Sequence, residues 1–84
     1  MRVVVADDSV LLREGLVRLL TEVECDVVAA VDDAPSFLAA VAEHRPDVAV
    51  VDVRMPPTMT DDGLRAAVAA RAAQPDLGVL MLSA

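Results

Sequence analysis

The chain has 84 residues, of which 56% are hydrophobic and 25% are charged, which is typical of one compact domain and excludes a disordered or fibrous chain. Its formal net charge of −7 argues against nucleic acid or an anionic membrane surface as a partner, because both need clusters of basic residues. No apolar run approaches the roughly 18 residues of a membrane helix, and Met1 and Arg2 lead directly into a strand-like segment instead of a signal peptide. We therefore expect a cytoplasmic protein, and the single cysteine, Cys25, suits a reducing compartment.

The first half of the chain alternates apolar and amphipathic segments. A β-branched run at residues 2–6 predicts a buried strand that stops at the polar residues 7–9. Residues 10–23 have the spacing of an amphipathic helix, and a second apolar run at residues 25–31 predicts another strand. The apolar side of the predicted helix consists of Leu12, Leu16, Leu19, Leu20 and Val23.

The second half repeats this alternation. Asp33 and Pro35 predict the start of a helix over residues 34–44, with Phe37, Leu38 and Val41 on its buried side. Residues 48–52 form a third apolar strand that ends on Asp52. A capping carboxylate of Asp61-Asp62 opens a helix over residues 62–74, and residues 78–82 form the last predicted strand, followed by Ser83. The apolar residues of that last helix are Leu64, Ala67, Val68 and Ala72.

Strands that alternate with helices predict an α/β fold with a parallel sheet and right-handed crossovers. If the strand order is 2-1-3-4, the winding direction switches between the first and third strands, where ligands bind in such sheets. Asp7, Asp8, Asp52 and Ser83 all follow or end predicted strands. We therefore expect them to meet at the carboxyl edge of the sheet.

Three carboxylates held together repel one another and need protons or a cation. Mg²⁺ prefers oxygen ligands and commonly leaves positions open for water or a phosphoryl oxygen. A carboxylate beside such an ion can act as a nucleophile on phosphorus. Taken singly, the same residues have simpler interpretations, since Asp7-Asp8 could cap a helix, Asp52 could simply end a strand, and Ser83 could be an ordinary hydroxyl near the end of the chain.

Four motifs in order resemble the receiver domains of two-component response regulators. They are Asp7-Asp8-Ser9, Asp52-Val53-Arg54-Met55-Pro56, Asp62-Gly63-Leu64 and Ser83-Ala84. The resemblance covers the whole chain and implies a flavodoxin-like receiver fold over residues 1–84. Residues 13–16 and 56–63 are most similar to receivers of regulators that carry a helix-turn-helix DNA-binding domain.

The resemblance also implies roles for individual residues. Asp52 would accept the phosphoryl group, and Ser83 would donate a hydrogen bond to it and report its presence. Asp7, Asp8, Asp52 and the main-chain carbonyl of Arg54 would bind Mg²⁺. A histidine kinase would be the partner that supplies the phosphoryl group, and the transcriptional output would lie outside this chain. No enzymatic turnover is implied, and the domain would at most phosphorylate itself.

Complete receivers continue through a further helix, strand and helix, which carry the family's active-site lysine, its switch aromatic and its output surface. The seven basic residues of this chain are all arginine, so no lysine is present to replace the family's active-site lysine. Without the later elements, residues 79–82 and one sheet face would be exposed and apolar, which predicts self-association, such as a homodimer.

Two alternatives to a phosphorylated receiver stay open. One is a non-phosphorylated pseudo-receiver that acts by binding or dimerising. The other is an Mg²⁺-dependent phosphohydrolase, which is less favoured because such enzymes usually place a second acid two residues after the nucleophile, where this chain has Arg54.

Overall fold

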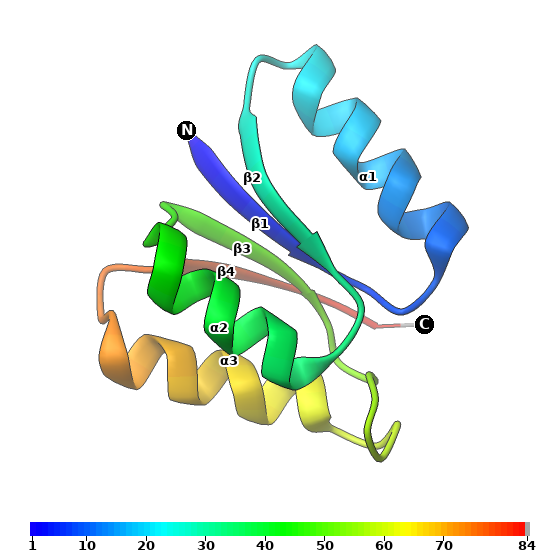
Figure 1. Cartoon of the computed structure of the whole chain (residues 1–84), viewed down its shortest axis with the longest axis vertical. Helices are drawn as coiled ribbons and strands as arrows, with labels where there is room; N and C mark the ends of the chain where they lie inside the picture. The colour runs from blue at the N-terminus through cyan, green and yellow to red at the C-terminus, as the bar shows by residue number, and fades with distance from the viewer. Residues whose placement is uncertain (84) are drawn as a thin grey trace.

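The computed structural model describes residues 1–83 and contains a four-stranded parallel sheet with helices on both faces (Figure 1). Ala84, the last residue of the Ser83-Ala84 motif, lies outside the described residues. The strands are β1 (Arg2–Ala6), β2 (Asp26–Val31), β3 (Val48–Asp52) and β4 (Gly78–Leu82), and the helices are α1 (Val10–Glu22), α2 (Ala34–His44) and α3 (Asp62–Ala73).

The predicted order of the strands is confirmed. Strand β1 pairs with β2 and β3, and β4 pairs with β3, so the order is β2-β1-β3-β4 and every pairing is parallel. Strands β1, β3 and β4 and helix α2 also have the predicted bounds. The winding direction therefore switches between β1 and β3, as the α/β prediction required.

Three element boundaries differ from the prediction by one residue. Helix α1 ends at Glu22 and β2 begins at Asp26, because Glu24 adopts a positive φ of 65° and the Cys25 amide donates to the Leu20 carbonyl at 2.9 Å. Helix α3 ends at Ala73, because Gln74 leaves the helical region with φ −132° and ψ 84°. These differences lie within the usual uncertainty of helix ends.

Of the aspartates predicted to cap α2 and α3, only the one before α2 does so. Asp33 caps α2 by accepting a hydrogen bond from the Ser36 amide at 2.7 Å, as expected. Asp61 occupies the corresponding position of α3 but makes no capping hydrogen bond through its side chain. The neighbouring Asp62 carboxylate accepts from both the amide and the hydroxyl of Thr58, so it stabilises the preceding loop instead of capping the helix.

The two faces of the sheet are covered unequally (Figure 1). Helices α2 and α3 cover one face, where the large buried residues include Phe37, Met55 and Leu77. Helix α1 covers only the β1–β2 part of the other face, where the fully packed cluster consists of Val3, Val5 and Val50. Most of the apolar core therefore lies between the sheet and the α2–α3 layer.

The predicted apolar side of α1 is largely exposed. None of its residues is buried, and Leu12, Leu19 and Val23 are 50%, 62% and 68% exposed. Leu16 and Leu20 do pack on the sheet, but only partly buried. The reason is that α1 lies alone on its face, so no neighbouring described helix covers its flanks.

Helix α3 packs through small residues and not through its larger apolar ones. Gly63, Ala66, Ala67 and Ala70 are buried against α2 and β3, whereas the larger Leu64 and Val68, and also Ala72, are exposed. Small side chains allow the helix to approach its neighbours closely, so the larger side chains point away. Among the helices of residues 1–83, none is long and apolar enough to cross a membrane.

Two valines in helices offer a matched test of this core. Val41 in α2 is 4% exposed and Val68 in α3 is 64% exposed. We expect Val41→Ala to lower the free energy of unfolding by about 2 kcal/mol, from lost burial and a residual cavity. Val68→Ala should change it little, because alanine is the better helix former. Urea unfolding followed by circular dichroism would measure both, and equal losses would contradict the assigned core.

Candidate metal centre

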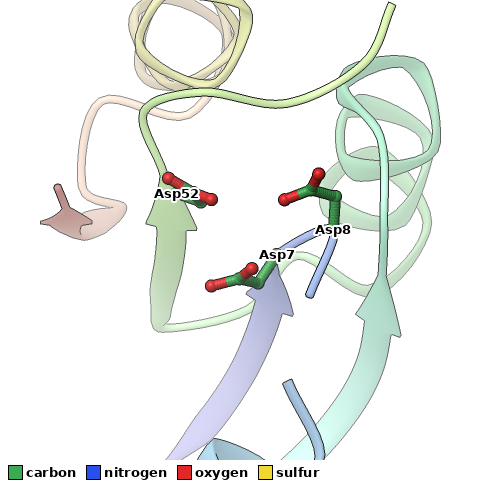
Figure 2. A group of neighbouring side chains, drawn as sticks. All are labelled: Asp7, Asp8 and Asp52. Carbon is green, nitrogen blue, oxygen red and sulfur yellow. The ribbon is translucent and has the colours of Figure 1, made fainter. Parts of the chain in front are cut away.

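The register of β1 and β3 brings two carboxylates together. Ala6 pairs with Val51, so the next residues on these strands, Asp7 and Asp52, lie side by side at the carboxyl edge of the sheet. Figure 2 shows Asp7 and Asp52 at the tips of the two strands, with Asp8 on the loop that follows β1. One carboxylate oxygen from each of the three residues lies within 4.8 Å of the others. The predicted convergence of Asp7, Asp8 and Asp52 is therefore present.

Asp7 is the buried member of this acidic cluster. Its side chain is 1% exposed, and its Oδ1 accepts a hydrogen bond from the Ser9 amide at 2.9 Å. Its Oδ2 is buried and has no hydrogen-bond partner among the described residues. A buried carboxylate oxygen without a partner is costly, so this atom requires a cation, a proton or water.

The loop after β1 is ordered by its own contacts. The Ser9 hydroxyl accepts from the Leu12 amide at 3.3 Å and caps α1, so the Asp7-Asp8 pair does not have the capping role considered as its simpler interpretation. The Arg13 guanidinium donates to the main-chain oxygen of Asp7 at 2.8 Å. The carboxylates of Asp7 and Asp8 thus lie beside that of Asp52 (Figure 2), while contacts with α1 hold the main chain of their loop.

Asp52 is half-buried and sits in an unfavourable electrostatic environment. Burial raises the pKa of its carboxyl group, and the charges of Asp7 and Asp8 raise it further. The Arg54 amide, which donates to Asp52 Oδ1 at 3.2 Å, and the Arg54 charge lower that pKa, but burial and repulsion prevail. Without a cation, the cluster therefore resists full ionisation.

Ser83 lines a pocket beside the carboxylates. The pocket has a volume of about 250 Å³ and is lined by Asp7, Asp52 and Ser83 together with Leu12, Leu16 and Leu82. The Val53 amide donates to the Leu82 carbonyl at 2.9 Å and so holds the end of β4 against the loop after β3. The structure thus brings the exposed Ser83 to the site. Arg54 follows Asp52 on that loop, and the coordination by its main-chain carbonyl stays a prediction.

The donor set fits Mg²⁺. All of its side-chain ligands are carboxylate oxygens, the chemistry that Mg²⁺ prefers, and the unpartnered Asp7 Oδ2 is an atom that a cation would satisfy. Ligands in an octahedron at roughly 2.1 Å from Mg²⁺ lie roughly 3 to 4 Å apart, so small side-chain rotations would bring the three oxygens into place. A bound cation would also remove the repulsion that raises the pKa of Asp52.

Sequence reasoning missed two residues that support the site. In the sequence, Arg13 belongs only to the pattern of residues 13–16 and Gly63 only to the motif Asp62-Gly63-Leu64, but in the structure Arg13 contacts the main chain of Asp7 and Gly63 abuts that of Asp52. A glycine in the first turn of an alanine-rich helix was the available signal for Gly63. Nothing in the sequence indicated which atom Arg13 would contact.

The fold and the site together define an α/β domain of flavodoxin-like strand order with an acidic cluster at its switch point. Residues 3–84 match the model of the response regulator receiver domain, and the chain belongs to this family.

Named relatives agree with this family. The chain is 43% identical over 84 residues to the "probable transcriptional regulatory protein NarL" of Mycobacterium tuberculosis, covering 99% of this chain and 38% of that protein. It is 43% identical over 83 residues to the protein-glutamate methylesterase/protein-glutamine glutaminase of Haloarcula marismortui, covering 99% of this chain and 21% of that protein. The solved signal receiver domain of NarL from M. tuberculosis superposes with a TM-score of 0.86 at 42% identity, covering 98% of this chain and 64% of that one.

The raised pKa of Asp52 predicts a pH dependence of stability without metal. The folded state holds the Asp52 proton more tightly than the unfolded chain, so this group's stabilisation is complete below pH 3.8 and is lost as the pH rises through the raised pKa. Asp52→Asn should therefore raise the melting temperature in EDTA at pH 7 and flatten its acid-side pH dependence. Thermal unfolding from pH 3 to pH 8 would measure this, with Asp61→Asn as an exposed control. A lower melting temperature for Asp52→Asn at pH 7 would contradict the prediction.

Proposed function

We propose that this chain is the receiver module of a cytoplasmic two-component pathway and that Asp52 accepts a phosphoryl group from a histidine kinase with the help of Mg²⁺. The observation that carries the proposal is the acidic cluster itself, in which a carboxylate oxygen of Asp52 lies within 4.8 Å of carboxylate oxygens of Asp7 and Asp8. Membership of the receiver family supports the same assignment.

The proposed reaction is a transfer between two nucleophiles. An Asp52 carboxylate oxygen would attack the phosphorus of the kinase phosphohistidine, forming an acyl phosphate as the P–N bond breaks and its electron pair returns to the imidazole. When bound, Mg²⁺ would neutralise charge on the transferring group. Asp7, Asp8, Asp52 and the main-chain carbonyl of Arg54 would hold the ion, and the Ser83 hydroxyl in the adjoining pocket would donate to a phosphoryl oxygen.

We propose that this receiver controls a transcriptional output that the chain itself does not contain. Relatives with similar coverage of this chain include NarL, already described, and the transcriptional regulatory protein DegU of Brevibacillus brevis, to which the chain is 36% identical. The chain spans only 38% and 34% of these proteins, so their activities come to it as a proposal. The Haloarcula relative is named as a methylesterase at the same identity as NarL, so relatives that share this receiver carry different outputs by name.

Incubation with acetyl phosphate and Mg²⁺ tests the phosphoacceptor directly. Intact mass spectrometry should show the addition of one phosphoryl group to the wild type and none to Asp52→Asn. The exposed Asp61→Asn variant should behave as the wild type, since Asp61 is not part of the acidic cluster. Addition to Asp52→Asn at the wild-type level would contradict the assignment.

The same samples separate the two alternative functions. An unmodified wild type that still binds Mg²⁺ in calorimetry would favour a pseudo-receiver. This chain has no lysine, whereas complete receivers carry an active-site lysine, so the experiment tests phosphorylation without that residue. Release of many phosphates per protein, without lasting modification, would favour a phosphohydrolase. The position two residues after Asp52 is Arg54, so a second catalytic acid is not found there.

We also propose that the 84-residue chain self-associates through β4 and the open face beside it. Strand β4 is an edge of the sheet, and its sequence, Gly78–Leu82, has no charged residue to discourage pairing with a second copy. Leu80 is 58% exposed and, by strand alternation, shares a face with the partly buried Leu82. A second copy would bury this apolar strip and satisfy the outer backbone groups of β4.

Charge placed on this strip should prevent association. We expect the wild type to sediment as a dimer or larger species at high micromolar concentration, and Leu80→Lys to shift the equilibrium toward monomer at least about tenfold, because like charges would face each other across a two-fold interface. Leu11→Lys is the matched control, since Leu11 is 84% exposed on α1. A wild type that is monomeric throughout this range would refute the interface.

A further inference from the structure

Gly63 lies in the first turn of α3, directly against the main chain of the proposed phosphoacceptor. A Cβ atom placed on Gly63 would overlap the main-chain oxygen of Asp52 and would lie 2.9 Å from its carbonyl carbon and 3.0 Å from the Val53 oxygen. The Gly63 amide donates to that Val53 oxygen at 2.9 Å. The start of α3 is therefore in backbone-to-backbone contact with the end of β3.

The need for glycine here is a need for space. No glycine of the described chain has a positive φ, so the conformational freedom of glycine is not in use at this position. Glycine within a helix costs about 1 kcal/mol relative to alanine, and α3 is otherwise rich in alanine. Gly15 in α1 provides the contrast, because a Cβ there would meet nothing within 4 Å.

The segment that Gly63 touches carries half of the proposed coordination. Asp52 supplies a carboxylate and Arg54 the predicted main-chain carbonyl, and the segment between them is fixed at three points. These are the Gly63 contact from α3, the Val53-to-Leu82 hydrogen bond from β4, and the Arg54 amide on Asp52 Oδ1. A shift of α3 away from β3 would release the first of these points and rotate the groups directed at the ion.

We propose that Gly63 is a positioning residue for the metal centre, because its missing side chain lets α3 dock on the Asp52 main chain and hold Asp52 and Arg54 in ligand geometry. The inference rests on the proposed Mg²⁺ site at Asp7, Asp8 and Asp52. A methyl group at position 63 meets backbone atoms, so no side-chain rotation can relieve the overlap and the helix or the loop must move.

Two glycine-to-alanine variants test the inference. Gly63→Ala should bind Mg²⁺ at least about tenfold more weakly than the wild type in calorimetry at pH 7, the scale typical of residues that orient metal ligands. Gly15→Ala should bind as the wild type does. A loss of packing alone would lower the melting temperature of Gly63→Ala equally in EDTA and in Mg²⁺, whereas a positioning role also reduces the rise that Mg²⁺ produces.

The outcomes distinguish this inference from the proposed function. Asp7→Asn serves as the reference for a destroyed site, and a wild type that binds no better than Asp7→Asn would overturn the metal centre and the positioning role together. A folded Gly63→Ala that binds within twofold of the wild type would overturn the positioning role alone.

Hydrogen exchange of the wild type keeps the test decisive if Gly63→Ala does not fold. Coupling between docking and metal binding is reciprocal, so Mg²⁺ should slow exchange of the Gly63 amide, which is bonded to Val53, more than that of the Gly15 amide. Equal slowing of both amides would overturn the inference.

Discussion

The parallel pairing of β1 with β3 is the constraint on which the rest of this structure depends. Its register sets Ala6 against Val51, and the following Asp7 and Asp52 are thereby forced together at one edge of the sheet. Such an arrangement of like charges is unfavourable by itself, and, after burial, it contributes to the raised pKa of Asp52. The apolar strands and the helices on both faces offset it, since residues 3–6 of β1 and residues 49–51 of β3 are buried.

The surrounding contacts convert this constraint into a defined site. Ser9 caps α1 and Arg13 holds the Asp7 carbonyl, so the first loop is ordered from the helix that follows it. On the other strand, Gly63 brings α3 against the Asp52 main chain. Each loop of the acidic cluster is thus supported by the helix that comes directly after it, which ties the geometry of the carboxylates to the packing of α1 and α3.

Much of the fold was predictable because its signals are local. Asp33 and Pro35 defined the start of α2, and the apolar runs defined β1, β3 and β4 to the residue. The failures concern partners that a local pattern does not contain. Leu19 has helical spacing yet is exposed because α1 has no neighbouring described helix, and Val68 is exposed because α3 approaches its neighbours through alanine.

The sequence by itself determined the alternation of strands and helices, the receiver-like motifs, and the presence of Asp7, Asp8, Asp52 and Ser83 at strand ends, since chain order and residue type carry that information. Only the tertiary structure decided what surrounds each carboxylate. Burial of Asp7 with an unpartnered Oδ2, and the contact of Gly63 with Asp52, arise between segments far apart in the chain or joined by an irregular loop. Distances across such junctions follow from how the layers pack, and packing is a property of the whole fold.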